Sequence, residues 1–268
     1  MEASSPIGIF DSGIGGLTVA RAVKNLMPNE QLIYFGDTAH LPYGDKSTAS
    51  IQAYSVKIAD VLLRARCKAI LIACNSASTA AFELVKAYVA SRAKVFDVIE
   101  PVVDYVSVHH GGKKVGLIGT KQTVNSGVYR QKIEALNKRV QFSSLATPLL
   151  APMIEEGFHN NQISQVIVEN YLEDEELRGV EALILGCTHY PLIKAQIDSF
   201  YDGSVEVIDS SEMVAQATFT ALNSLGLLNT GEKRKDRFLV SDYTPSFENT
   251  TKLFFGKEVS LEKYPLWE

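Results

Sequence analysis

The chain has 268 residues, a formal net charge of −5 and 46% hydrophobic residues. This hydrophobic content is ordinary for a globular protein and excludes a disordered chain. The small negative charge argues against a general nucleic-acid-binding protein, which would carry a basic face. The length suits one large domain or two domains of about 100–150 residues each.

The cysteine content and the N-terminus indicate the compartment. Three cysteines are an odd number at low density, which is unlike a disulfide framework. Residues Met1–Pro6 contain no basic segment followed by an apolar stretch, and no apolar run approaches the ~20 residues of a membrane span. We therefore expect a cytoplasmic protein with reduced thiols and no contact with a membrane.

Strands and helices are predicted to alternate along the chain. Short apolar runs predict strands over Ile7–Phe10, Gln31–Phe35, Ala69–Ala73, Lys94–Val98, Lys114–Ile118, Val140–Ser144, Ala182–Leu185, Val205–Ile208 and Arg237–Ser241. Amphipathic spacing predicts helices over Leu17–Leu26, Ser47–Ala65, Thr79–Ala90, Asn125–Leu136, Ile163–Leu172 and Met213–Leu225. This alternation predicts an α/β fold with mostly parallel sheets, in which ligands bind beyond the carboxyl ends of the strands.

A faint internal repeat indicates two related halves. The segment Ile7–Ser12 resembles Val115–Thr120, and Ala69–Asn75 resembles Ala182–Thr188. We therefore expect two pseudo-symmetric αβα domains over residues 1–97 and 98–207, with the active site in the cleft between them. The tail 208–268 is expected to return to the first domain. Glu100-Pro101 is the expected crossing point, because proline favours extended geometry in the residue before it.

Two of the three cysteines occupy equivalent places in these halves. Cys74 and Cys187 each follow a predicted strand and precede polar residues that can begin a helix. Backbone N–H groups and the helix dipole at such a junction lower the pKa of a thiol. A single cysteine there would ordinarily be a core residue, but a matched pair favours a function. Cys67 precedes a strand and has no counterpart in the other half, and we interpret it as structural.

Metal and nucleotide binding are the alternatives for these segments. Cys74, Cys187 and His189 could supply metal ligands, but no two of them have the close C-x-x-C spacing of a zinc site. The loop Asp11–Gly16 superficially resembles a dinucleotide-binding motif, with Asp37 as a ribose ligand. Its glycines do not follow G-x-G-x-x-G, and Asp11 would repel a pyrophosphate. We expect neither a metal nor a cofactor.

Several motifs together resemble the glutamate racemases. They are Phe10–Leu17, Gly36–Thr38, Pro42–Gly44, Cys74–Ser78, Gly186–Leu192 and, more weakly, Pro152–Gly157. These motifs run in family order over most of the chain, to which the C-terminal tail contributes little. The cysteine motifs are shared with other amino-acid racemases, whereas the first loop and the Pro-Tyr-Gly loop are more particular to the glutamate enzymes.

The resemblance implies a cofactor-independent isomerase that interconverts L- and D-glutamate with two cysteine bases and supplies D-glutamate for peptidoglycan. The residues agree with this chemistry, because inverting a stereocentre by proton transfer needs a base on one face and an acid on the other. By similarity, Cys74 is the base for D-glutamate and Cys187 the base for L-glutamate. In each direction the other cysteine donates.

The resemblance also implies roles for the polar residues near the two thiols. Asp11 and His189 are expected to tune the protonation of the cysteines, and Glu155 to support His189, with Glu156 as its alternative. The expected substrate contacts are Asp11, Ser12, Pro42, Tyr43, Gly44, Asn75, Ser76, Thr188 and His189, with Thr123 as a further candidate. The family more often has threonine at position 76, so we expect the hydroxyl function to be kept.

Alternatives remain open at this level. A racemase for aspartate or another amino acid would share the cysteine motifs, and a non-catalytic amino-acid-binding protein would share the cleft. The expected partner is a small-molecule substrate, glutamate, and no nucleic acid. A homodimer is compatible with the sequence.

Overall fold

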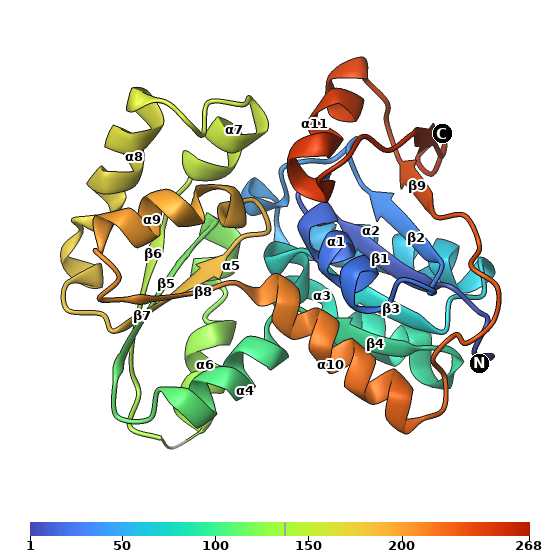
Figure 1. Cartoon of the computed structure of the whole chain (residues 1–268), viewed down its shortest axis with the longest axis horizontal. Coiled ribbons are helices and arrows are strands. Elements are labelled where there is room, and N and C mark those ends of the chain that lie inside the picture. Colours follow the sequence, from blue (N-terminus) through green and yellow to red (C-terminus); the bar gives the residue numbers. More distant parts are fainter. Residues whose placement is uncertain (137) are drawn as a thin grey trace.

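The computed structural model describes residues 1–136 and 138–268 and contains two β-sheets covered by helices (Figure 1). The first sheet has the strand order β10 (Leu261–Lys263), β9 (Arg237–Val240), β2 (Leu32–Gly36), β1 (Ile7–Asp11), β3 (Ala69–Ile72) and β4 (Lys94–Asp97). The second has the order β6 (Gln141–Ala146), β5 (Lys114–Gly119), β7 (Ala182–Gly186) and β8 (Glu206–Ile208). Every described strand pair is parallel. The predicted α/β class is confirmed.

The two sheets repeat one topology, which explains the internal repeat of the sequence. The order β2-β1-β3-β4 in the first sheet corresponds to β6-β5-β7-β8 in the second. Strands β3 and β7, which precede Cys74 and Cys187, each pair with the first strand of their half. Because parallel strands end at the same edge of a sheet, each cysteine lies at a carboxyl edge.

The α-helices form the outer layers and connect successive strands. They are α1 (Leu17–Leu26), α2 (Thr48–Arg64), α3 (Asn75–Val89), α4 (Glu100–His109), α5 (Lys121–Asn125), α6 (Val128–Ala135), α7 (Leu150–Glu155), α8 (Gln162–Leu172), α9 (Lys194–Phe200), α10 (Ser210–Ser224) and α11 (Pro245–Phe255). Four short 3-10 helices complete the described elements: η1 (Tyr43–Asp45), η2 (Ala90–Arg92), η3 (Glu175–Leu177) and η4 (Tyr190–Ile193).

The first sheet has a separate hydrophobic core on each face, and alternating strand residues point into one core or the other. Ile7 and Ile9 of β1 pack toward Leu17 of α1. Phe10, on the opposite face of the same strand, packs with Ile58 of α2. Strands that are buried on both faces in this way give the continuous apolar runs by which the sequence predicted them.

The structure corrects some predicted elements. Helix α3 begins at Asn75 rather than Thr79, so the polar residues after Cys74 are helical. Glu100 and Pro101 begin helix α4 and do not form an extended crossing. Proline fits there because the N–H groups of a first helical turn have no partner within the helix, so the missing N–H costs nothing. The predicted helix 125–136 is divided at Gly127, which has a φ of 68°. Elements α4, α7, α9, α11 and β10 were not predicted.

The tail contributes both to the first sheet and to the region between the sheets. Strands β9 and β10 add to the edge of the first sheet beside β2. Helix α10 packs against α1 and α4, and in Figure 1 it starts near the middle of the molecule and runs along the lower side of the lobe that contains β3 and β4. The expected return of the tail is therefore seen in the strand pairing, while the domain boundaries at 97 and 207 stay predictions.

A buried ion pair joins distant parts of the first half. The Nζ of Lys68 lies 2.6 Å from Oε2 of Glu30, and it also donates to the carbonyl oxygens of Ala3 at 2.5 Å and Leu227 at 2.7 Å. Lys68 is fully buried. Removing one partner would leave an uncompensated buried charge at a cost of roughly 3–5 kcal/mol, so the contact holds the N-terminus and the segment after α10 in this arrangement.

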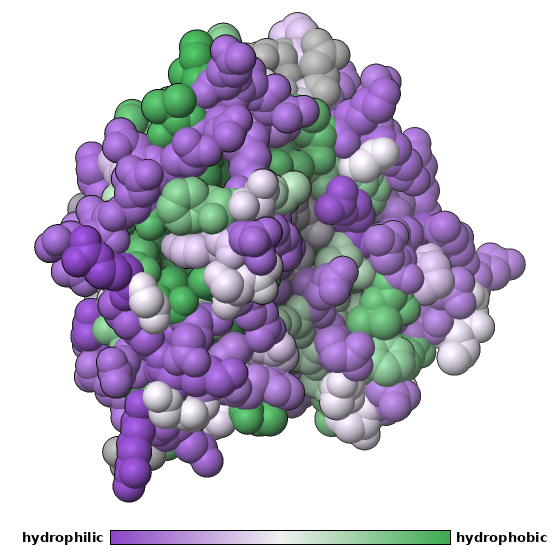
Figure 2. Space-filling view, turned by 60° about the vertical axis from the view of Figure 1, so that its left-hand side comes forward, coloured by the Kyte–Doolittle hydropathy of each residue, from purple (hydrophilic) through white to green (hydrophobic). Residues whose placement is uncertain are grey.

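The surface is largely polar. Figure 2 shows a face on which hydrophilic residues predominate and hydrophobic residues form separate patches. Among the described residues, no helix combines the length and apolar character that crossing a membrane requires.

Candidate active site

A small cavity lies where the carboxyl ends of the two sheets face each other. Its volume is about 30 Å³, and it is lined by Ser12, Pro42, Tyr43, Gly44, Cys74, Asn75, Ser76, Thr120, Ala151, Glu155, Gly186, Cys187, Thr188 and His189. The structure thus brings together most residues that the sequence singled out. A cavity of this volume has room for a water molecule and is smaller than an amino acid, so its walls must separate to admit one.

Cys74 occupies the N-cap position of α3 and is 6% exposed. Its thiol donates to Oγ of Ser12 over 3.7 Å. Burial and the charge of Asp11 raise the pKa of this thiol well above its usual range, and the N–H groups of Ala77 and Ser12 offset only part of that rise. The prediction of a lowered pKa was wrong for Cys74 in this conformation, because desolvation outweighs the helix N-terminus.

Cys187 has a different environment. Its Sγ lies 3.5 Å from Nδ1 of His189, and Nε2 of the same ring lies 2.8 Å from Oε1 of Glu155. The second contact is an ion pair when the ring is protonated. Burial alone would lower the pKa of His189, but Cys187 and Glu155 together raise it well above its ordinary value. Glu156 is exposed, so the geometry favours Glu155 over Glu156 as the partner.

Asp11 lies behind the cavity wall and is fully buried. Its Oδ2 accepts hydrogen bonds from the backbone N–H groups of Gly13 at 3.2 Å and Gly16 at 2.9 Å. Its Oδ1 has no hydrogen-bond partner among the described residues. Burial raises the pKa of Asp11, although His189 and the two N–H groups act in the opposite direction. The charge of Asp11 is therefore coupled to Cys74 of the first half and to His189 of the second.

Gly15 shows what the glycine-rich loop does. A Cβ atom at this position would lie 2.3 Å from Cε1 of His189 and 2.8 Å from Oγ1 of Thr188. The loop of the first half therefore approaches the Cys187 segment more closely than any other residue would permit. Oγ1 of Thr18 also donates to the carbonyl oxygen of Thr188. These contacts give the glycines a packing role in place of a phosphate-binding one.

Asn75 offers a donor to the cavity. Its Oδ1 accepts a 2.7 Å hydrogen bond from the hydroxyl of Tyr129, on α6 of the other half. Its Nδ2 is buried and has no hydrogen-bond partner in the described part of the chain. Since an unpaired buried amide is unfavourable, this N–H₂ group is ready to donate to an acceptor on a ligand.

These features can be compared with known proteins. The model of the Asp/Glu/Hydantoin racemase family matches residues 17–218. A glutamate racemase from Thermus thermophilus is 41% identical over 240 residues, which cover 90% of this chain and 88% of the relative. The chain belongs to this racemase family. A glutamate racemase from Chlorobaculum parvum is 36% identical over 260 residues, covering 97% of this chain and 95% of the relative.

The fold comparison agrees with the family. The solved structure of glutamate racemase from Francisella tularensis in complex with D-glutamate matches this chain with a TM-score of 0.93. The sequence identity is 38%, and the match covers 99% of each chain. This racemase is therefore an isomerase, as the motifs predicted.

A hydroxyl cluster crosses between the halves of the racemase. Oγ of Ser76 lies 2.8 Å from Oγ1 of Thr120 and 3.5 Å from Oγ1 of Thr123, and Thr120 donates to Thr123 at 3.1 Å. Thr123 does not line the cavity but supports residues that do. Thr120 was missed by sequence reasoning, although the internal repeat pairs it with Ser12 and could have revealed it.

The Pro-Tyr-Gly loop lines the cavity as predicted, but the hydroxyl of Tyr43 is already engaged. It donates to Oδ2 of Asp37 at 2.7 Å. A Cβ atom at Gly44 would lie 2.8 Å from Cβ of Thr120, so this loop also touches the second half. The side of Tyr43 that remains for a ligand is therefore its ring and backbone.

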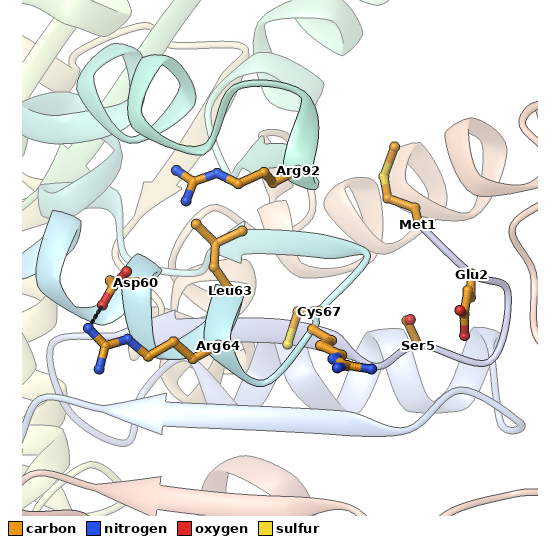
Figure 3. Close-up of a pocket in the computed structure, with 9 residues that line it drawn as sticks. Met1, Glu2, Ser5, Asp60, Leu63, Arg64, Cys67 and Arg92 are labelled. Atoms are coloured by element: carbon orange, nitrogen blue, oxygen red, sulfur yellow. Dashed lines mark ion pairs between the residues drawn. The ribbon is translucent and has the colours of Figure 1, made fainter.

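Cys67 lies elsewhere. It is at the floor of a separate hollow of about 390 Å³ near the N-terminus, at the opposite ends of the strands. Figure 3 shows Arg64 directed to Asp60, with which it forms an ion pair, and Arg92 above them, extending toward the same side of the view. Burial raises the pKa of the Cys67 thiol to about 12. This position fits the structural interpretation of Cys67.

In the part of the chain that the structure describes, the carboxylates, imidazoles and thiols do not gather as metal ligands do. Within residues 1–136 and 138–268, no three His, Cys, Asp or Glu side chains form a group that could hold a metal ion.

Proposed function

We propose that this racemase interconverts L- and D-glutamate by proton transfer between the substrate and two cysteines, Cys74 and Cys187. The observation that carries the proposal is the placement of these thiols, which follow equivalent strands of the two halves and line one cavity. Glutamate as the substrate is supported by relatives at 36–41% identity that are glutamate racemases. The matching structure from Francisella tularensis holds D-glutamate.

The two thiols have unequal surroundings, which favours a resting state that is ready to react with L-glutamate. Burial beside Asp11 keeps the proton on Cys74. A protonated His189, supported by Glu155, stabilises a negative sulfur at Cys187. With L-glutamate bound, the Cys187 thiolate takes the α-proton and the Cys74 thiol returns one to the opposite face. The products are D-glutamate, a Cys187 thiol and a Cys74 thiolate, and D-glutamate reacts by the reverse steps.

The carbanion formed between these transfers needs electrostatic stabilisation. Donors near the α-carboxylate lower the energy of this state because they are already oriented in a buried site. Nδ2 of Asn75 and the hydroxyls of Ser12, Ser76 and Thr188 are the proposed donors around the cavity. Tyr43, Pro42 and Gly44 form the wall that shapes the pocket.

The test is racemisation of purified protein followed by circular dichroism, with L-glutamate and L-aspartate compared. In D₂O, deuterium is expected at the α-carbon of glutamate, which a binding protein would not produce. Turnover of aspartate without turnover of glutamate would overturn the choice of substrate. On the family resemblance we also propose that the product, D-glutamate, is used for peptidoglycan synthesis in the cytoplasm, and a homodimer stays a prediction that a sizing measurement tests.

A further inference from the structure

Asp37 is the centre of a buried polar contact behind the cavity wall. Its side chain is completely buried. Oδ2 accepts from the hydroxyl of Tyr43 at 2.7 Å, and Oδ1 accepts from Oγ of Ser241 and from Nε1 of Trp267, each at 2.7 Å. Nδ1 of His40 lies 3.0 Å from Oδ2. Both oxygens of one carboxylate are thus held by groups from its own loop and from two distant segments.

The indole of Trp267 is fixed on several sides. Its ring lies 4.5 Å from that of His40 and 5.3 Å from that of Tyr54, both edge to face. Nζ of Lys57 lies over the indole, 4.4 Å from its centre. The rings of His40 and Tyr54 stack at 4.1 Å. Such packing leaves the indole N–H little freedom other than to donate to Asp37.

The hydrogen bond between Trp267 and Asp37 is linked to the cavity because the same carboxylate also binds Tyr43. Trp267 and Tyr43 donate to different oxygens of Asp37, and Tyr43 lines the cavity beside Gly44. Gly44 in turn lies against Thr120 of the other half. If one donor is lost, a buried charge is left less satisfied, and the remaining donors must move to compensate.

We propose that Trp267, the penultimate residue of the chain, is a positioning residue for the substrate pocket. Through Asp37 it holds Tyr43 and the loop 37–44 in the place that the substrate requires. The inference rests on the proposed function for its kinetic readout. It also assigns a role to the C-terminal segment, to which the family motifs do not extend.

The main test is Trp267→Phe, which keeps an aromatic ring and removes the N–H donor. We expect KM for glutamate to rise roughly 5- to 20-fold, with kcat within about twofold; this is less than the direct loss of a hydrogen bond to a charged group would give, because the change reaches the substrate only through Asp37 and Tyr43. Tyr264→Phe is the matched control, because Tyr264 lies in the same segment and packs on Phe35 without touching Asp37. Its KM is expected to be unchanged. An unchanged KM in Trp267→Phe, even with a lowered melting temperature, would mean that Trp267 is only structural.

A second measurement does not depend on turnover. Trp267 is the chain's single tryptophan, so its fluorescence reports this contact alone. In Tyr43→Phe, Asp37 loses one donor, and we expect a shift in tryptophan emission. An emission spectrum identical to that of the unmodified protein would overturn the link through Asp37. If the unmodified protein does not racemise glutamate but the emission shift occurs, the proposed function fails and the link stands.

Discussion

The Nε2 atom of His189 lies 2.8 Å from Oε1 of Glu155, while the other nitrogen of the ring faces the sulfur of Cys187. The ring therefore connects a carboxylate on α7 to a thiol at the end of β7. Glu155 contributes to raising the pKa of His189, and a protonated ring stabilises negative charge on the sulfur. In the proposed mechanism, Glu155 therefore acts through His189 and does not need to touch the substrate.

Glu155→Gln is expected to change the pH dependence of the L-to-D reaction. Without the carboxylate, the pKa of His189 falls, and the ring loses its proton at lower pH. The alkaline limb of kcat/KM for L-glutamate should therefore move to lower pH, with a loss of about tenfold near neutral pH. Glu156→Gln is the control, because Glu156 is exposed. Superimposable pH profiles for Glu155→Gln and the unmodified protein would contradict the role of Glu155.

Cys74→Ala and Cys187→Ala each remove one of the two proton-transfer groups. Each change should lower racemisation by about 10²- to 10⁴-fold while circular dichroism shows an intact fold. In D₂O, Cys74→Ala should still exchange the α-proton of L-glutamate without inversion, and Cys187→Ala that of D-glutamate. Cys67→Ala serves as the control with little change. Turnover near normal in either of the first two variants would refute the two-base assignment.

Tyr129→Phe tests how the amide of Asn75 is oriented. The Tyr129 hydroxyl donates to Oδ1, which leaves Nδ2 available to the cavity. Without it, the amide can turn, and KM for glutamate should rise about three- to tenfold. Tyr88→Phe is a suitable control, since it also removes a tyrosine hydrogen bond, to Asp60, at an exposed position. Equal KM values in the two variants would exclude this role for Tyr129.

Asp97 gives a prediction for stability against pH. Burial raises its pKa from 3.8 to about 6, only partly offset by the N–H of Glu100. Because the folded-state pKa is the higher one, the stability that Asp97 contributes is present at pH 4 and is lost as the pH rises to about 6. Asp97→Asn, which keeps an acceptor for Glu100, should therefore gain up to about 3 kcal/mol relative to the unmodified protein between pH 4 and pH 7. Urea unfolding at both pH values measures this difference, and an equal offset at both would contradict it.

The sequence predicted most strands and both cysteines because these features have local signals. Strands such as β3 and β7 are buried on both faces, and Cys74 and Cys187 follow them within two residues. The raised pKa of Cys74 was not predictable, since it depends on how completely the folded chain excludes water. Asp37 stands in a recognised motif, but its partner Trp267 lies 230 residues further along the chain. Only the fold shows such a contact.

The path of the chain between the sheets constrains how the enzyme can move. It crosses twice, once through α4 after β4 and once through α10 after β8, and these two helices pack against each other. Two adjacent covalent connections allow rotation about the line through them and resist sliding or twisting. We therefore expect the cavity to open mainly by rotation about this line, so that both thiols return to the same alignment when it closes.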